Sequence, residues 1–251
     1  MSVKSTVRSA GRWLGAGVGL AAGAYASYVA YAWLTYGHAR PAATAEDRDS
    51  LLDRFIPTYE VAERHQIEVN APAATTFEAA THLDLLASPV SRAIFRGREL
   101  IMGSQGRPVA ARGSFLEQMT AIGWGMLAEV PGREVVMGAV TQPWRADVVF
   151  RPLRPEDFAA FNEPDYVKIV WTLRADATGA STSVFRTETR VATTDAGARA
   201  RFRRYWALAS PGIILIRWLS LGPLKADAER RARAQAADES FERDEWGSLD
   251  A

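Results

Sequence analysis

The sequence predicts an α+β protein in which a twisted antiparallel sheet is covered by a long C-terminal helix and is preceded by one N-terminal transmembrane helix. Three observations predict this class. Residues 13–37 carry no charge, several segments between residues 65 and 191 alternate apolar and polar side chains, and residues 196–234 have helical spacing. Consecutive strands with helices set apart from them are typical of α+β domains. We therefore expect a membrane anchor (1–37), a linker (38–60), a folded domain (61–234) and a polar tail (235–251).

The uncharged run from Trp13 to Gly37 is long enough to cross a bilayer as a helix. At 1.5 Å per residue a helix of this length spans the roughly 30 Å hydrocarbon core. Aromatic residues lie towards both ends of the run, as they do at membrane interfaces. They are Trp13, Tyr28, Tyr31, Trp33 and Tyr36. An uncleaved anchor is the interpretation that accounts for both the length and the aromatic ends.

Three other interpretations of this run stay open. Ala24-Tyr25-Ala26 fits a signal-peptide cleavage site, although the apolar run continues past it. Gly17-x-Gly19-x-x-Ala22 fits a dinucleotide-binding fingerprint, but no predicted strand precedes it and no acidic residue follows at the spacing of the ribose contact. The third interpretation is a soluble N-terminal helix.

The residues around the run indicate its orientation in the membrane, and glycines within it indicate how it packs. Three basic residues precede it (Lys4, Arg8 and Arg12), whereas Arg40 and Arg48 follow it. Basic residues favour the cytoplasmic side, so the N-terminus is expected there and the domain on the far side. Small residues at four-residue spacing allow helices to pack closely, which predicts a homo-oligomer, unless glycine is simply common in this helix. They are Gly15, Gly19 and Gly23.

The first half of the domain is predicted to contain one strand and up to three helices. A short helix at 49–55 lies in the linker, and residues 65–70 alternate like a half-buried strand that Ala71-Pro72 ends. Proline is tolerated in a first helical turn, so a helix is expected at 75–86. A second helix at 90–102, a glycine-rich loop at 103–113 and a helical or irregular segment at 115–122 follow.

The second half is predicted to be mainly strands. Residues 124–130 and 134–141 are strands joined by a Pro131-Gly132 turn, followed by strands at 146–150, 167–174 and 183–191. A proline-rich loop covers 151–165. The C-terminal helical region, 196–234, is expected to break near Ser210-Pro211-Gly212 and at Gly222-Pro223, because proline removes a helical hydrogen bond.

Two faces are predicted for the start of this C-terminal helix. Apolar residues at helical spacing should face the sheet; they are Phe202, Tyr205, Trp206 and Ala209. Basic residues should lie on an exposed face or bind anionic phospholipid; they are Arg199, Arg201, Arg203 and Arg204. The apolar stretch 213–221 is interpreted as buried in the domain, with contact to a bilayer surface as the alternative.

Several segments resemble the START-like helix-grip superfamily, also called SRPBCC, which contains polyketide cyclases/dehydrases and lipid-transport proteins. They are HQIEVNAPAATTF (65–77) with its I-x-V-x-A-P pattern, LAEVPGREVVMGAV (127–140), VKIVWTLRA (167–175), STSVFRTETRV (181–191) and the terminal helix. The resemblance covers roughly residues 60–234. It implies a helix-grip fold, in which the curved sheet wraps around the last helix and encloses an apolar cavity. The usual members lack a membrane anchor, and the proline breaks would interrupt the gripping helix.

Composition excludes several kinds of chemistry. The absence of cysteine excludes disulfides, iron–sulfur clusters and thiol nucleophiles, and the balance of 30 basic and 29 acidic residues gives no reason to expect nucleic acid. The three histidines form no metal motif, and His65, at the start of a strand, is interpreted as a surface or capping residue. Arg186, Glu188 and Arg190 form a charge ladder, interpreted as the solvent face of the sheet, with an acidic head-group site as the alternative. No catalytic, metal-binding or cofactor-binding residue is therefore predicted.

The sequence favours a membrane-anchored START-like domain (61–234) that binds an apolar or amphipathic small molecule, such as a lipid, between sheet and helix. Seven residues are predicted to line this cavity, on strand alternation and helical spacing. They are Trp124, Met126, Met137, Trp171, Phe185, Thr187 and Trp206. A cyclase/dehydrase-type enzyme is the second hypothesis, with Thr187, or Arg186 and Glu188, as its polar groups. The third is a structural or assembly protein that associates through its membrane helix.

Overall fold

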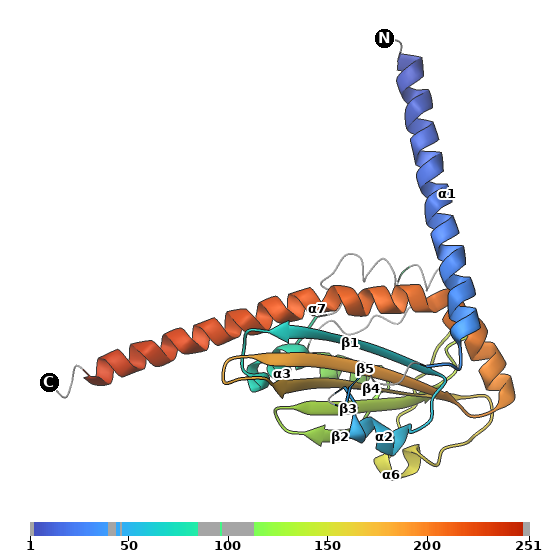
Figure 1. Cartoon of the computed structure of the whole chain (residues 1–251). Coiled ribbons are helices and arrows are strands. Elements are labelled where there is room, and N and C mark those ends of the chain that lie inside the picture. Colours follow the sequence, from blue (N-terminus) through green and yellow to red (C-terminus); the bar gives the residue numbers. More distant parts are fainter. Residues whose placement is uncertain (1–2, 40–43, 46, 85–95, 97–112, 248–251) are drawn as a thin grey trace.

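The computed structural model describes residues 3–39, 44–45, 47–84, 96 and 113–247. A long helix, α1 (Val3–Thr35), projects away from an α+β domain, as Figure 1 shows. The domain contains the helices α2 (Ser50–Phe55), α3 (Ala73–Thr81), α5 (Phe115–Ala121), α6 (Pro155–Phe158) and α7 (Ala196–Gly247). Its strands are β1 (Val61–Val69), β2 (Gly125–Val130), β3 (Glu134–Thr141), β4 (Val167–Ala177) and β5 (Ser183–Thr193).

The five strands form one antiparallel sheet in the order β1-β5-β4-β3-β2. The first strand pairs with the last, and Val61 lies opposite Val191. β2 and β3 are joined by the predicted turn, in which Gly132 adopts a positive φ of 70° that glycine allows at little cost. β1 and β2 are thus the two edges of the sheet.

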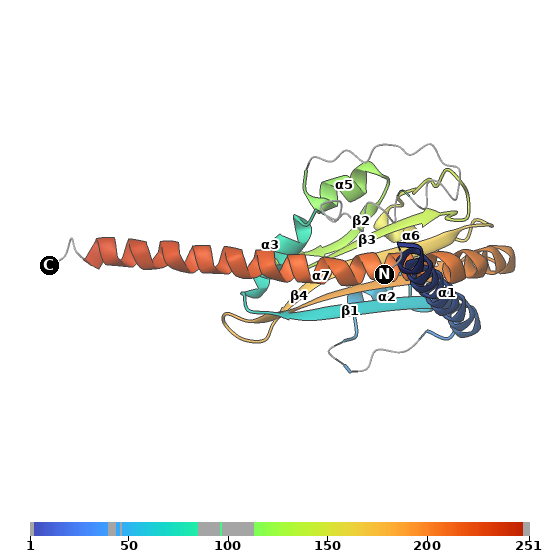
Figure 2. The same ribbon diagram turned by 90° about the horizontal axis from the view of Figure 1, so that it is seen from above.

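Apolar clusters cover both faces of the sheet. On one face α7 runs along the sheet (Figures 1 and 2), and Leu221 and Leu224 of α7 pack with Trp171 and Phe185. On the opposite face α2 and α6 pack, with Phe158 fully buried. The strands alternate between these two clusters because successive side chains point to opposite faces. This arrangement places α7 as the cover of one face, as the sequence predicts.

The predicted breaks in the C-terminal helix are wrong. α7 is assigned as one helix of 52 residues that includes Pro211 and Pro223, and it continues past residue 234 into the expected polar tail. A proline costs a helix about 3 kcal/mol, but packing of the sheet-facing side of α7 into the core opposes that cost. Figure 1 shows that the first part of α7 is inclined to the rest, so the helix bends without ending.

Other predicted elements differ in extent. The strand expected at 146–150 does not form: an isolated bridge, between Arg151 and Val140, follows this segment, and Val149 is exposed. β1 starts four residues earlier than predicted, and α3 ends at Thr81 instead of residue 86. Residues 115–121 are helical, with a capping box formed by Ser114 and Glu117. The predicted helix at 90–102 and the loop at 103–113 fall almost entirely outside the described residues.

α1 is joined to the domain by its C-terminal end. Tyr36, just beyond α1, packs with Val61, Phe202 and Trp206, and the Arg203 guanidinium donates to the carbonyl of Trp33 at 2.7 Å. A cation at the end of a helix satisfies carbonyls that lack helical partners. Three members of the predicted basic run bind within the protein, since Arg199 and Arg201 also pair with acidic side chains.

Within the described part of the chain, one helix is long and apolar enough to cross a membrane by length and composition, namely residues 196–238 of α7. Core helices pass the same test, and one side of α7 is packed against the sheet.

Candidate functional site

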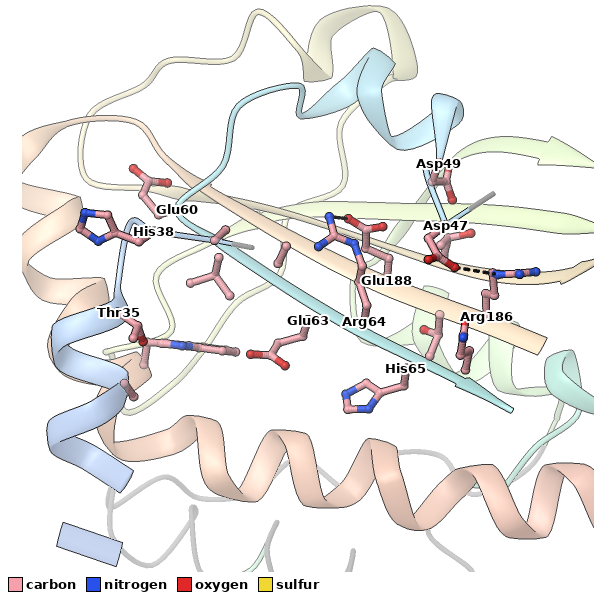
Figure 3. Close-up of a pocket in the computed structure, with 18 of the residues that line it drawn as sticks. Thr35, His38, Asp47, Asp49, Glu60, Glu63, Arg64, His65, Arg186 and Glu188 are labelled. Carbon is pink, nitrogen blue, oxygen red and sulfur yellow. Dashed lines mark hydrogen bonds and ion pairs between the residues drawn. The ribbon is translucent and has the colours of Figure 1, made fainter. Parts of the chain in front are cut away.

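A pocket of about 590 Å³ lies beside the edge strand β1, between the end of α1, the linker and α7 (Figure 3). Every residue from Glu60 to Gln66 lines it. Because successive strand residues point to opposite faces, the pocket consists of two recesses, one on each side of β1. We call them the helix-side recess, under α7, and the linker-side recess, under the segment before α2.

The outer end of the helix-side recess is aromatic. Its lining includes Tyr28 and Tyr31 from α1, Tyr36, Val61 of β1 and Trp206 of α7. Trp206 stacks on Phe202 with ring centroids 5.9 Å apart, which holds its indole in place. This end of the recess can therefore receive an apolar group.

The inner part of the helix-side recess is a polar band. Glu63 lies opposite Thr189 and His65 opposite Thr187 on the paired strands β1 and β5. Arg217 of α7 completes the band and donates from Nη1 to Oγ1 of Thr187 at 3.3 Å. Figure 3 shows Glu63 and His65 pointing from β1 towards α7. The band interrupts the apolar core under α7, since one apolar cluster contains Val61 and Trp206 and another contains Phe185 and Leu221.

Two polar atoms of this band are buried and have no hydrogen-bond partner among the described residues. They are Nε2 of His65 and Oγ1 of Thr189. An unsatisfied buried polar group costs about 1–3 kcal/mol. His65 lines the pocket, and Thr189 lies just beyond the lining, opposite Glu63 on the same side of the sheet, so the polar part of a bound molecule at this end could approach both.

Burial shifts the pKa values of the two titratable groups on β1 in opposite directions. Desolvation raises the pKa of the Glu63 carboxyl, and the positive charges of Arg217 and Arg64 oppose the rise. Desolvation and the charge of Arg217 lower the pKa of the His65 imidazole. Both shifts favour neutral side chains, which can exchange hydrogen bonds or protons with a ligand.

The linker-side recess contains the charge ladder, which is buried instead of facing solvent as the sequence suggested. Arg190 donates to Glu188 at 2.7 Å and to Asp53 of α2 at 2.5 Å, and Arg64 donates to Glu188 at 2.7 Å. The ladder was misjudged because α2 covers this face of the sheet, with Ile56 accepting from Arg190 as well. Buried charges need such pairing, so the ladder fastens α2 to the sheet.

Acidic residues before α2 add to this fastening. Asp47 pairs with Arg186 at 3.6 Å. Glu134 of β3 is buried next to Asp49, and burial together with that neighbouring carboxyl raises the pKa of Glu134 to about 8. Glu134 is then protonated at neutral pH and can donate a hydrogen bond to Asp49. We interpret the linker-side recess as a structural contact that holds the linker and α2 against the sheet.

The seven residues predicted to line the cavity are distributed over three places. Thr187 and Trp206 line the helix-side recess. Four others are buried in the cluster beneath α7, where Trp124 and Trp171 have ring centroids 5.8 Å apart; the four are Trp124, Met137, Trp171 and Phe185. Met126 was predicted to point inwards, but it is 46% exposed because it lies on the edge strand β2.

Sequence reasoning missed Glu63, His65 and Arg217. The interpretation of His65 as a surface or capping residue is wrong, since the strand begins at Val61 and places the imidazole under α7. The available signal was the alternation of Val61, Glu63, His65 and Ile67, in which two polar residues occupy positions of the apolar face. Within the described residues, no group of three or more acidic or histidine side chains could hold a metal ion.

Comparison with known proteins identifies similar structures. A comparison with protein-family models finds no match, and neither does one with curated proteins. Among solved structures, a START superfamily protein from Mycobacterium smegmatis is 12% identical, with 69% of this chain and 98% of that chain covered and a TM-score of 0.25. The Zhui aromatase/cyclase from Streptomyces sp. R1128 is 16% identical, with 69% and 96% covered and a TM-score of 0.23. CalU16 from Micromonospora echinospora is 13% identical, with 69% and 86% covered and a TM-score of 0.23.

Scores this low carry no argument about substrate or activity. The topology itself identifies the fold, because a curved antiparallel sheet, opened by the β1–α3 unit and closed by a long C-terminal helix along one face, is the arrangement that the sequence resemblance implied. The chain therefore has a START-like helix-grip fold.

Proposed function

We propose that the chain is a membrane-anchored helix-grip protein that binds an amphipathic small molecule, such as a lipid, in the helix-side recess. The observation that carries this proposal is the pair of buried polar atoms on His65 and Thr189 without a partner among the described residues, in the polar band that interrupts the apolar interface under α7. The apolar part of the ligand would lie towards Trp206 and the tyrosines, and its polar part would meet the polar band. α1 serves as the anchor, with the domain next to the bilayer.

Replacing Thr189 by Val gives the sharpest test, because binding and folding should respond in opposite directions. The change removes a buried hydroxyl that has no partner, so the ligand-free protein should keep or gain stability. A ligand that donates to or accepts from this hydroxyl should lose about 0.5–1.5 kcal/mol, which is roughly a two- to tenfold weaker affinity. Affinity is measured with a fluorescent fatty acid and the full-length chain in lipid nanodiscs, and stability by urea unfolding.

The matched control is Thr172→Val on the other face of the sheet, where Thr172 lines the linker-side recess. The Thr172 hydroxyl donates to Glu134 at 3.3 Å, so its loss should lower stability and leave affinity unchanged. Binding at the helix-side recess is refuted if Thr189→Val destabilises the protein and leaves affinity unchanged. Mass spectrometry of the purified chain identifies the molecule bound in the cell.

An enzyme of the cyclase/dehydrase type is the second candidate. The observation that favours it is the acid–base pair formed by Glu63 and His65, two residues apart on one strand face, with Arg217 opposite. Such groups can move protons on a bound substrate. Incubation of the bound molecule with the protein, followed by mass spectrometry, distinguishes the two functions, since a product that His65→Asn abolishes without loss of binding would establish turnover.

Association through the membrane helix remains part of the proposal. An added side chain at Gly19 or Gly23 would meet no neighbouring atom within 4 Å, which leaves this part of the stripe available to a second copy. Replacement of Gly19 by Leu should abolish cross-linked dimers in membranes if the stripe is used.

A further inference from the structure

We propose that the part of α7 between residues 205 and 224 lies on the membrane surface, with the apolar side chains of its outward face immersed in the lipid leaflet from which α1 emerges. This inference rests on the proposed anchoring by α1 and adds a second membrane contact, made by the folded domain itself. The partner is the lipid bilayer.

The outward face of α7 is apolar and exposed. Leu208, Leu215 and Trp218 are 57%, 41% and 63% exposed, and their spacing of seven and three residues places them on one side of the helix. Between residues 205 and 224 the only charged residue is Arg217, whose guanidinium turns inwards to Thr187. An exposed apolar stripe of this kind marks a surface for a membrane or another protein.

The direction of α1 favours the bilayer. Figure 1 shows α1 leaving the domain on the side of α7 that is turned away from the sheet, and Figure 2 shows the same arrangement from above, with the N-terminus over α7. The bilayer that receives α1 therefore lies on the same side as the outward face of α7. Immersed residues of an interfacial helix are typically leucine, phenylalanine and tryptophan, as here.

The length of α1 determines how deeply the domain end of this helix enters the bilayer. Side chains from Gly19 to Ser27 are exposed, and burial against the domain begins at Tyr28. From Trp13 to Ser27 the helix supplies about 22 Å at 1.5 Å per residue, which is less than the roughly 30 Å of the hydrocarbon core. Five further residues are needed, so the span must extend to about Ala32, where α1 already contacts the domain.

The point at which α1 crosses α7 therefore lies within the part of α1 that spans the hydrocarbon core. The hydroxyl of Tyr25 donates to the carbonyl of Leu208 at 2.9 Å, which marks the height of α7 along α1. Tyr25 and Ala32 are seven residues apart, so this part of α7 lies about 10 Å within the hydrocarbon boundary. Interfacial helices bury their apolar face by about 5–10 Å, and the two depths agree.

This position places the binding site at the bilayer. Tyr28 and Tyr31, which line the aromatic end of the helix-side recess, follow Tyr25 directly along α1. An amphipathic molecule in the same leaflet would then have a short path to the recess.

Single spin labels test the inference on the full-length chain. The chain has no cysteine, so Leu208→Cys, Leu215→Cys, Val149→Cys and Leu20→Cys each accept one nitroxide after reconstitution into phosphatidylcholine vesicles containing phosphatidylserine. We measure collision of the label with oxygen, which concentrates in the hydrocarbon, and with a water-soluble nickel chelate. Val149, which is exposed in a loop, is the matched control, and Leu20 reports on the anchor.

The labels on α7 should lose contact with the nickel reagent and gain contact with oxygen, whereas the label at position 149 should stay open to the nickel reagent. Nickel contact at both α7 positions, with the label at position 20 in lipid, overturns the inference and leaves the anchor intact. Loss of contact with both reagents at the α7 positions means that a second copy or another protein covers the stripe, which also overturns it. Nickel contact at position 20 overturns the anchor and this inference with it, whereas ligand binding is judged separately by the Thr189→Val test.

Discussion

Replacing Glu134 by Gln should remove part of the pH dependence of unfolding between about pH 6 and 8. Burial and the neighbouring Asp49 raise the pKa of the Glu134 carboxyl from 4.5 to about 8, against the opposing effects of Arg174 and Thr172. The native protein therefore keeps this proton in a range where the unfolded chain has released it. Because the native state binds the extra proton, its stability falls as pH rises through this window.

The magnitude follows from proton linkage. One proton held by the native state alone changes the free energy of unfolding by at most about 1.4 kcal/mol per pH unit. Between pH 6 and pH 8 the wild-type protein should thus lose about 2 kcal/mol through this residue, in addition to whatever other groups contribute. Glutamine imitates the protonated carboxyl, since it can donate to Asp49 and accept from Thr172. The variant should lack this contribution.

Urea unfolding of the full-length chain in detergent, followed by tryptophan fluorescence at pH 6, 7 and 8, measures the effect. Glu129→Gln, at an exposed position of the neighbouring strand β2, is the matched control and should behave like the wild type. The reasoning is refuted if Glu134→Gln and the wild type lose the same stability between pH 6 and 8.

Three further changes test the packing, each by urea unfolding. Trp171→Ala should cost about 3–5 kcal/mol, because a large ring is removed from the buried cluster under α7; a loss below 1 kcal/mol would contradict that packing. Gly138→Ala should cost about 1–3 kcal/mol, because the added methyl group would overlap Leu127 on the face opposite α7. An unchanged urea midpoint would contradict the close approach of Leu127 to Gly138. Arg190→Met should cost about 1.5–3 kcal/mol, because buried Glu188 keeps Arg64 but loses its charged hydrogen bond to Arg190. The exposed Arg154→Met should cost less than about 1 kcal/mol, and equal losses would show that the ladder is not buried.

The sequence predicted the fold well where its signal was periodic. The alternation of Val167, Ile169, Trp171 and Leu173 identified β4, because successive side chains of a strand point to opposite faces and this set shares the face under α7. The continuity of α7 escaped prediction because local proline rules do not include the packing energy of a helix against a sheet. The segment at 146–150 was misassigned for a related reason, since its alternation has no partner strand.

The candidate site was predicted less well, because its identity depends on which groups lack partners. The tryptophans attracted attention as ligand contacts, yet Trp124 and Trp171 fill the core, as aromatic side chains usually do. Glu63 and His65 are ordinary polar residues in the sequence. Only the register of β1 against β5 and the position of Arg217 above them turn these residues into a recess. The alternation of the strand places both residues on its apolar face, but no local pattern shows that Arg217 lies above them.

The pairing of the first strand with the last has a consequence for biosynthesis. Val61 can pair with Val191 only after Val191 has been synthesised, 130 residues later. At 5–20 residues per second this delay is roughly 6–26 s, while the apolar segment of α1 has already left the ribosome. Throughout that interval β1 exposes unpaired backbone groups, which is the condition under which strands aggregate. Nascent chains stopped before Ser183 should therefore be degraded or held by chaperones, because the sheet closes only when β5 arrives.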